Sequence, residues 1–238
     1  MPLDEAIRTM LRSAEAQGQT ALSEYQAKKL LNAYGIPVTR EALALSPDEA
    51  AAIAARLGYP VVMKACSPQL MHKSEGGWVR LNLNDEADVR RTYTQIAGAA
   101  SDLALEGVLV QEMVPGQREL VMGLSRDPQF GPCVMLGLGG IMTEVFRDTV
   151  FRMAPFDDIE ARDMIEELAS RSMLGEFRGQ RPADMETLGR ALTAIGRIGL
   201  ENEGITEMDV NPLIIDPEGR VVAVDALVVL GGHRAEIN

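Results

Sequence analysis

Histidine is scarce in this 238-residue chain, where it occurs only at positions 72 and 233. Cysteine is equally rare, because Cys66 and Cys133 are the only two, and both lie among apolar residues. Two cysteines in a chain of this size provide neither a disulfide framework nor a metal cluster. We therefore expect the protein to work in a reducing compartment.

Basic charge and long apolar runs are also limited. The chain has 23 Lys and Arg against 35 Asp and Glu, a formal net charge of −12. A nucleic-acid surface needs clustered basic residues to neutralise phosphates, and here they are scattered. No stretch approaches the ~20 apolar residues that span a bilayer, and the N-terminal residues carry acids where a signal peptide carries positive charge. The sequence predicts a cytoplasmic protein that binds neither nucleic acid nor membrane.

The order of predicted elements indicates a mixed fold. Apolar residues at helical spacing, two capping boxes (Ser23 with Gln26, Ser46 with Glu49) and terminal glycines predict three early helices. β-branched runs such as "YPVVMKA" and "GVLVQEM" predict strands between and after them, and Asn84 is the expected cap of a fourth helix. This order predicts an α+β (mixed α/β) protein of two lobes. The expected divisions are an N-terminal helix at 1–20, a first lobe at 21–114, a second lobe at 115–232 and a tail at 233–238.

The stretch "MDVNPLIIDPEGRVVAVD" predicts a hairpin with oxygen ligands on one face. "DPEG" suits a type I turn whose Gly219 is left-handed. Pairing outward from this turn places Asn211 opposite Asp225, with Asp209 on the same face. Asp and Asn are depleted in strands, and their oxygens suit Mg²⁺. The alternative is a solvated face with acids near a turn, and Pro212 weakens the expected register because it cannot donate to a ladder.

Two basic residues are candidates for phosphate contacts. Lys64 ends the apolar run "YPVVMK", and a buried lysine needs an anionic partner such as a phosphate. Arg152 lies on a predicted strand among apolar neighbours, in "VFRMAP", where it could clamp a phosphate. Taken alone, Lys64 fits an ordinary strand-end lysine at least as well.

The region around Pro115-Gly116, a natural hinge between the lobes, supplies further nucleotide candidates. Glu112 and Glu119 bracket the hinge, and a carboxylate there can accept both ribose hydroxyls. The neighbouring backbone at Met113 and Val114 can hydrogen-bond an adenine edge. Either glutamate alone is also explained as a surface residue. Together with Lys64 and Arg152, these residues predict a nucleotide held between the two lobes.

Several stretches resemble the ATP-grasp fold, and in particular the nucleotide-binding β subunit or domain of the ADP-forming acyl-CoA (acetyl-CoA) synthetases, within the succinyl-CoA synthetase-like superfamily. The matching stretches run from about residue 21 to about residue 230. They are "LSEYQAKKLLNAYGIPV", "YPVVMKACSPQLMHKSE", "GVLVQEMVPGQRELVMGLSRDPQFGPCVMLGLGGI", "DTVFRMAP" and "ITEMDVNPLII".

The resemblance implies a phosphoryl relay. An acyl phosphate forms on a CoA-binding partner, whose histidine passes the phosphoryl group to a second histidine in the ATP-grasp part, and this histidine delivers it to ADP·Mg²⁺ or runs the reverse. The second histidine belongs to a motif read here as "HKSE", so the resemblance assigns it to His72. By the same matching, the residues expected to contact the nucleotide are Lys64, Glu112, Met113, Val114, Glu119 and Arg152. Asn211 and Asp225 are expected to hold Mg²⁺, and Asp209 is expected to face the histidine or the metal.

The chemistry of imidazole agrees with this assignment. A neutral imidazole is a competent nucleophile near pH 7, and the phosphoimidazole that it forms can phosphorylate ADP reversibly. A histidine that travels between two sites needs a loop with defined limits, and Pro68 and Gly76-Gly77 provide them around His72.

The expected function is therefore that of an acid–thiol ligase subunit with ATP/ADP and Mg²⁺ as cofactors. It would be active with a CoA-binding α subunit, which handles the acyl phosphate and CoA, in an α₂β₂ assembly. One alternative is a nucleotide-sensing regulatory module of an acyltransferase-type system, although the sequence carries no acetyltransferase segment. Another is a self-contained ATP-grasp ligase that joins a carboxylate to an amine or thiol without a histidine carrier.

Overall fold

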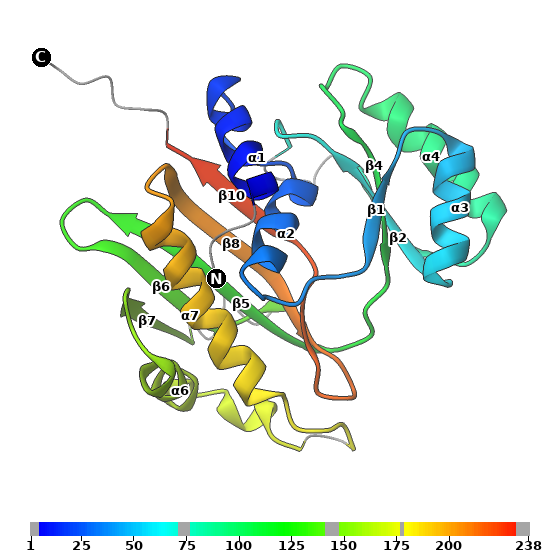
Figure 1. The fold of residues 1–238 in the computed structure, drawn as a ribbon. Coiled ribbons are helices and arrows are strands. Elements are labelled where there is room, and N and C mark those ends of the chain that lie inside the picture. Colours follow the sequence, from blue (N-terminus) through cyan, green and yellow to red (C-terminus); the bar gives the residue numbers. More distant parts are fainter. Residues whose placement is uncertain (1–4, 71–76, 141–147, 177–178, 232–238) are drawn as a thin grey trace, which may run out of the picture. The chain divides into compact units, whose positions relative to one another are not determined.

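The computed structural model describes residues 5–70, 77–140, 148–176 and 179–231 (Figure 1). His72 and His233 lie outside these ranges. The described helices include none with the length and apolar character required to cross a membrane. The chain forms two compact units. The four-stranded unit comprises Ala21–Gln26 and Thr39–Val114, and the six-stranded unit comprises Met1–Thr20, Ala27–Val38 and Pro115–Asn238.

The four-stranded unit is an antiparallel sheet with two helices. Its strands are β1 (Glu41–Ala44), β2 (Val61–Cys66), β3 (Val79–Leu83) and β4 (Gly107–Glu112), in the order β1-β4-β2-β3. The helices α3 (Pro47–Leu57) and α4 (Glu86–Ala99) pack on the sheet (Figure 1). Met63 and Ala65 of β2 join Ile53 and Val89 of these helices in one buried core. Because side chains alternate along a strand, Lys64 lies on the opposite face of β2.

Side-chain caps explain where these helices begin. The Ser46 hydroxyl accepts a hydrogen bond from the Glu49 N–H at 3.2 Å, with Pro47 as the first helical residue, which confirms the predicted cap. The predicted cap of α4 at Asn84 is wrong by one residue, because Asp85 accepts from the Asp88 N–H at 2.8 Å. The Asn84 amide instead donates to the Asn82 carbonyl at 2.7 Å.

The six-stranded unit has a second antiparallel sheet. Its strands are β5 (Arg118–Asp127), β6 (Gly131–Leu138), β7 (Thr149–Met153), β8 (Ile205–Ile215), β9 (Val221–Ala223) and β10 (Ala226–Leu230). Five of them follow the order β10-β8-β5-β6-β7, and β9 pairs with β8. The helical elements of this unit are α1 (Glu5–Ala16), most of α2 (Glu24–Ala33), α6 (Asp158–Glu167), η2 (Arg171–Leu174) and α7 (Met185–Glu201).

The helix α7 defines the covered face of this sheet (Figure 1). A side chain at Gly199 would overlap Leu124 of β5, and one at Gly196 would contact Val134 of β6. We call the side of the sheet that carries Leu124 and Val134 the α7 face. It holds the apolar core of the unit, because Leu124, Val134 and Met208 of β8 are all buried.

The expected lobes differ from these units in the segment Ala27–Val38. Its contacts lie in the six-stranded unit, and this is why it does not group with the rest of 21–114. The Lys28 Nζ donates to the Val224 carbonyl at 3.2 Å, and the Tyr34 hydroxyl donates to Glu201 Oε2 at 2.8 Å. Val38 also forms a parallel bridge with Ala223.

Candidate functional site

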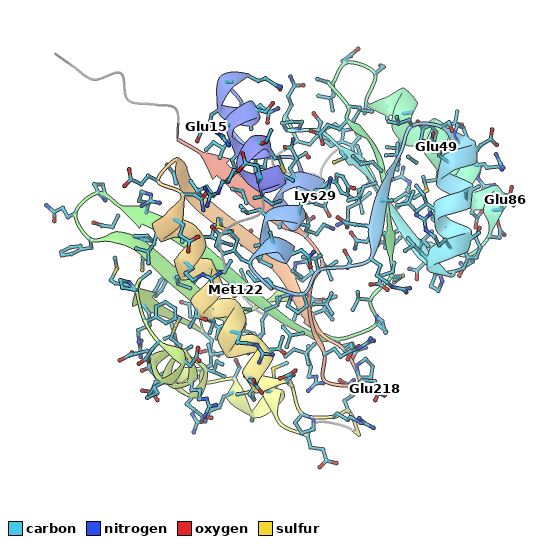
Figure 2. The ribbon with its side chains drawn as sticks, in the orientation of Figure 1. Glu15, Lys29, Glu49, Glu86, Met122 and Glu218 are labelled. Carbon is cyan, nitrogen blue, oxygen red and sulfur yellow. The ribbon has the colours of Figure 1, made fainter. Side chains whose placement is uncertain are left out.

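The turn between β8 and β9 has the geometry that the sequence predicts. The Gly219 N–H donates to the Asp216 carbonyl at 2.9 Å, and the Asp216 N–H donates to the Arg220 carbonyl at 3.0 Å. Gly219 has φ +85°, a left-handed conformation that glycine adopts without strain. Figure 2 labels Glu218 at the tip of this turn. The turn therefore fixes the register of the strands that follow it.

The register continues to the candidate metal ligands. The Asn211 N–H donates to the Asp225 carbonyl at 3.2 Å, and the next pair along β8 and β10 is Val210 with Ala226. Pro212 does not break the pairing with Val224, because its carbonyl accepts from the Val224 N–H at 3.0 Å, whereas the pairing of β8 with β5 shifts register between Leu120 and Met122. The predicted pairing of Asn211 with Asp225 is confirmed.

Asp209 lies on the same side of the sheet as this pair, opposite Gly123 of β5 and Leu227 of β10. We call this side the Asp209 face. Its members alternate with the buried Met208 and Val210, which point to the other side. Asp209 and Asp225 are half-buried and Asn211 is exposed. One face thus presents two carboxylates and an amide side by side.

This donor set fits Mg²⁺. Carboxylate and amide oxygens are hard ligands, and Mg²⁺ is usually held by one or two protein groups together with waters and substrate phosphates. Within the described ranges, no group of three or more His, Cys, Asp and Glu side chains could hold a metal by itself. A cation held at the Asp209 face would take its remaining ligands from water and substrate phosphates.

Two glutamates extend the Asp209 face. Glu119 belongs to it because it lies four residues before Gly123 in β5 and therefore points to the same side of the sheet. A side chain at Gly140 would come within 3.0 Å of Glu119 Oε2. The predicted nucleotide residue Glu119 is thus brought to the same face as the candidate metal ligands. Glu207 was missed in the sequence, although it precedes Asp209 by two residues in β8 and lies exposed opposite Ser125. The alternation of Glu207, Asp209 and Asn211 was the available signal.

Arg152 is not brought to this face. It lies in β7 opposite Val134, whose side chain is on the α7 face. There its guanidinium donates to Glu160 Oε2 at 3.0 Å and pairs with Glu167, both in α6. The hydrogen bonds that Arg152 donates to Glu167 and then to Glu160 raise the pKa of Arg152. The expectation that Arg152 would join the other residues is corrected, because the alternation of the strand turns its side chain to the opposite side of the sheet.

In the four-stranded unit, Lys64 is almost completely buried on β2. Its side chain is 5% exposed, and its Nζ lies 2.7 Å from Oε1 of Glu24, whose side chain is 0% exposed. The anionic partner that a buried lysine requires is therefore at least in part a carboxylate of the same unit. No local sequence pattern indicates this pair, because the two residues are 40 positions apart.

The other candidates of this unit lie at the end of β4. Both oxygens of Glu112 accept from Arg40, whose backbone N–H is at 2.8 Å and whose Nε is at 2.7 Å. Met113 and Val114 follow in an irregular, half-buried segment. The hydrogen bonds to Arg40 hold the Glu112 carboxylate at the point where β4 ends.

The candidate nucleophile His72 lies outside the described residues, but both flanking segments are described. Leu70 is buried in the core of the four-stranded unit, and its N–H donates to the Ser67 carbonyl at 3.1 Å. On the other side, Trp78 packs on the same core, and its carbonyl accepts from the Ala65 N–H at 2.9 Å. Leu70 and Trp78, which flank residues 71–76, thus both pack on the core of the four-stranded unit.

Two antiparallel sheets, each packed against helices and joined in this order, define the ATP-grasp class of fold. The family model for the ATP-grasp domain matches residues 13–230, and the chain belongs to this family.

The chain is also similar in sequence to ADP-forming acetate–CoA ligases. The chain is 39% identical over 227 residues to the β subunit of acetate–CoA ligase [ADP-forming] I from Pyrococcus furiosus, and the match covers 94% of this chain and 97% of that subunit. It is 41% identical over 206 residues to acetate–CoA ligase [ADP-forming] I from Archaeoglobus fulgidus, and this match covers 85% of the chain but 30% of that ligase.

A solved structure matches over the same length. It is the dinucleotide-forming acetyl-coenzyme A synthetase 1 of Ca. Korarchaeum cryptofilum in complex with coenzyme A and Mg-AMPPCP, with its phosphohistidine segment pointing towards the nucleotide-binding site. The TM-score is 0.83 at 44% identity, and the match covers 94% of this chain and 100% of that chain.

Proposed function

We propose that this chain is the nucleotide-binding subunit of an ADP-forming acyl-CoA synthetase, with ATP or ADP and Mg²⁺ as cofactors. Its reaction is the transfer of a phosphoryl group between His72 and the nucleotide. The observation that supports the proposal is the pairing of Asn211 with Asp225 beside Asp209, because carboxylate and amide oxygens on one sheet face suit Mg²⁺ and the relatives of the chain are acyl-CoA ligases.

In this proposal the imidazole of His72 carries the phosphoryl group. An oxygen of the ADP β-phosphate attacks the phosphorus, the P–N bond breaks, and its electron pair returns to the imidazole as the P–O bond of ATP forms. Asn211 and Asp225 hold Mg²⁺, which offsets the charge on the transferred group. Asp209 faces the histidine or the metal.

Other residues bind the nucleotide. Lys64 supplies positive charge to the phosphates, while Glu112, Glu119 and the backbone at Met113 and Val114 orient the nucleoside. We leave Arg152 out of this set, because its pairs with Glu160 and Glu167 lie on the α7 face.

The proposal requires an α partner. The Pyrococcus relative is a β subunit, and the Archaeoglobus ligase is a longer chain of which this one spans 30%. We propose that the CoA-binding and acyl phosphate steps belong to this partner, in an α₂β₂ assembly.

Phosphate labelling tests the proposal. The chain and its CoA-binding partner are incubated with γ-labelled ATP and Mg²⁺, and the expected product carries acid-labile, base-stable phosphate on His72. His72→Ala should lose the label. His233→Ala, which removes the other histidine, should keep it. An unlabelled wild-type protein, or label that persists in His72→Ala, contradicts the relay. ATP binding without any label would instead indicate a nucleotide-sensing module.

A further inference from the structure

Glu24 is a fully buried carboxylate that the proposed reaction does not yet use. It is the first residue of α2, and its side chain is 0% exposed. Its Oε1 lies 2.7 Å from the Nζ of Lys64, within the four-stranded unit. A charge buried to this extent is expensive unless an opposite charge and hydrogen bonds compensate for it.

The start of α2 holds Glu24 in place. The Ser23 N–H donates to Gln26 Oε1 at 3.0 Å, and the Gln26 N–H donates to Ser23 Oγ at 3.3 Å. This is the reciprocal capping box that the sequence predicts. Ser23 is fixed in turn by Glu106, whose Oε2 accepts from the Ser23 hydroxyl at 2.6 Å. A negative charge in the first turn of a helix is also favoured by the helix dipole.

Stability is a weak explanation for this ion pair. Burying two charges costs about as much as their attraction returns, and well-packed apolar residues often replace such a pair without loss. Val62 and Cys66, which share the Lys64 side of β2, are apolar and buried, so an apolar pair could replace Lys64 and Glu24 together. A charged lysine at this position therefore calls for a function that uses its charge.

We propose that Glu24 is a positioning residue for phosphoryl transfer, which keeps the Lys64 ammonium charged and in one orientation for the nucleotide phosphates. An ammonium carries three N–H donors, so a contact with one carboxylate is compatible with a phosphate contact. The inference rests on the proposed function, in which Lys64 contacts the nucleotide. Glu24 acts through Lys64 and does not itself touch the substrate.

A double-mutant cycle on the complex with the CoA-binding partner tests the inference. The dissociation constant of ADP·Mg²⁺ is measured for the wild type, Glu24→Gln, Lys64→Met and the double variant. Glu24→Gln should weaken binding about tenfold, which corresponds to ~1.4 kcal/mol. In the Lys64→Met background the same change should alter the constant less than about twofold, because the residue that Glu24 positions is gone.

Glu106→Gln is the matched control. It also removes a carboxylate charge near the start of α2, but the amide oxygen of glutamine can still accept the hydrogen bond from the Ser23 hydroxyl. The capping box then keeps Glu24 in place, and nucleotide affinity should remain at the wild-type value. Thermal unfolding of each variant reports on folding. Should Glu24→Gln fail to fold, Glu24→Asp keeps the charge and withdraws the carboxylate by one methylene, and it should weaken ADP binding by less than Glu24→Gln would.

The outcomes separate the two proposals. If Lys64→Met binds ADP·Mg²⁺ like the wild type, Lys64 has no role in nucleotide binding. The inference about Glu24, which depends on that role, is then overturned as well. If Lys64→Met binds weakly but a folded Glu24→Gln or Glu24→Asp binds normally or more tightly, only the role of Glu24 is overturned. Equal effects of Glu24→Gln in both backgrounds overturn it as well.

Discussion

Asn211 of β8 lies opposite Asp225, the residue directly before β10, and the Asn211 N–H donates to the Asp225 carbonyl at 3.2 Å. This relationship brings an amide and a carboxylate together although the two residues lie on different arms of the hairpin. It makes the Mg²⁺ requirement of the enzyme a direct test of the site.

Asp225→Asn keeps the size of the side chain and removes its charge. We expect the Mg²⁺ concentration for half-maximal activity to rise about tenfold or more, because a neutral amide is a weaker ligand for a divalent cation. A Mg²⁺ titration of ATP formation by the complex measures this effect. Glu218→Gln removes an exposed charge from the tip of the same hairpin and should leave the titration unchanged. An Asp225→Asn enzyme with the wild-type requirement would rule out the metal role.

Arg152→Gln should affect stability and not nucleotide binding. Its pairs with Glu160 and Glu167 are partly exposed, so we expect a loss of roughly 1 kcal/mol or less in the free energy of unfolding. The KM for ATP should stay at the wild-type value, because the side chain lies on the α7 face. Urea denaturation and steady-state kinetics check the two parts. A severalfold increase in KM would show that Arg152 contacts the nucleotide after all.

The N-cap of α7 predicts a pH dependence. Asp184 accepts from the hydroxyl of Thr187 at 2.6 Å and from its N–H at 2.9 Å, and these hydrogen bonds lower the pKa of Asp184. Asp184→Ala should cost about 1 kcal/mol of stability at neutral pH. Because the pKa is lower in the folded state, this contribution is complete above the unfolded pKa, about 3.9, and is lost as the pH falls through the folded value.

Urea denaturation at pH 7, 5, 4 and 3 measures this effect. The difference between wild type and Asp184→Ala should be constant from pH 7 to 5 and shrink below about pH 4. A difference that stays constant down to pH 3 would mean that the ionised carboxylate does not stabilise the helix.

Gly219→Ala should disturb the turn that sets the register. Gly219 has φ +85°, and a side chain there would overlap the Pro182 carbonyl oxygen. Gly131 is a matched control, because it has φ +83° but no atom within 4 Å of an added Cβ. Gly131→Ala should cost about 1 kcal/mol for the backbone strain alone, and Gly219→Ala should cost clearly more. Equal losses in chemical denaturation would show that the contact with Pro182 relaxes freely.

The sequence predicts best where a local rule determines the geometry. The "DPEG" turn specifies its own conformation, and the register then follows residue by residue to Asn211 and Asp225. The caps at Ser23 and Ser46 are equally local. The cap at Asn84 was misplaced because two neighbouring residues, Asn84 and Asp85, have similar capping propensity, and only the hydrogen bonds that their side chains form in the structure distinguish them.

The remaining features depend on long-range packing. Arg152 has apolar neighbours on both sides in "VFRMAP", so the sequence does not reveal which side of β7 faces the helices. Phe151 is 55% exposed, and the Arg152 side chain points towards α6, where it donates to Glu160. The pair of Glu24 and Lys64 joins a helix start to a strand far along the chain, and no periodic pattern links them. The segment Ala27–Val38 belongs to the six-stranded unit, whose strands all lie after residue 115 in the chain.

The register of β9 and β10 against β8 also constrains how this protein can change in length. Loss of one residue between Arg220 and Asp225 would shift the carboxylate by one position, so that it would no longer lie opposite Asn211. An insertion at the tip of the turn, beside Glu218, would leave that pairing intact. We therefore expect insertions and deletions in this hairpin to be tolerated at its tip and selected against in the short segment that leads to Asp225.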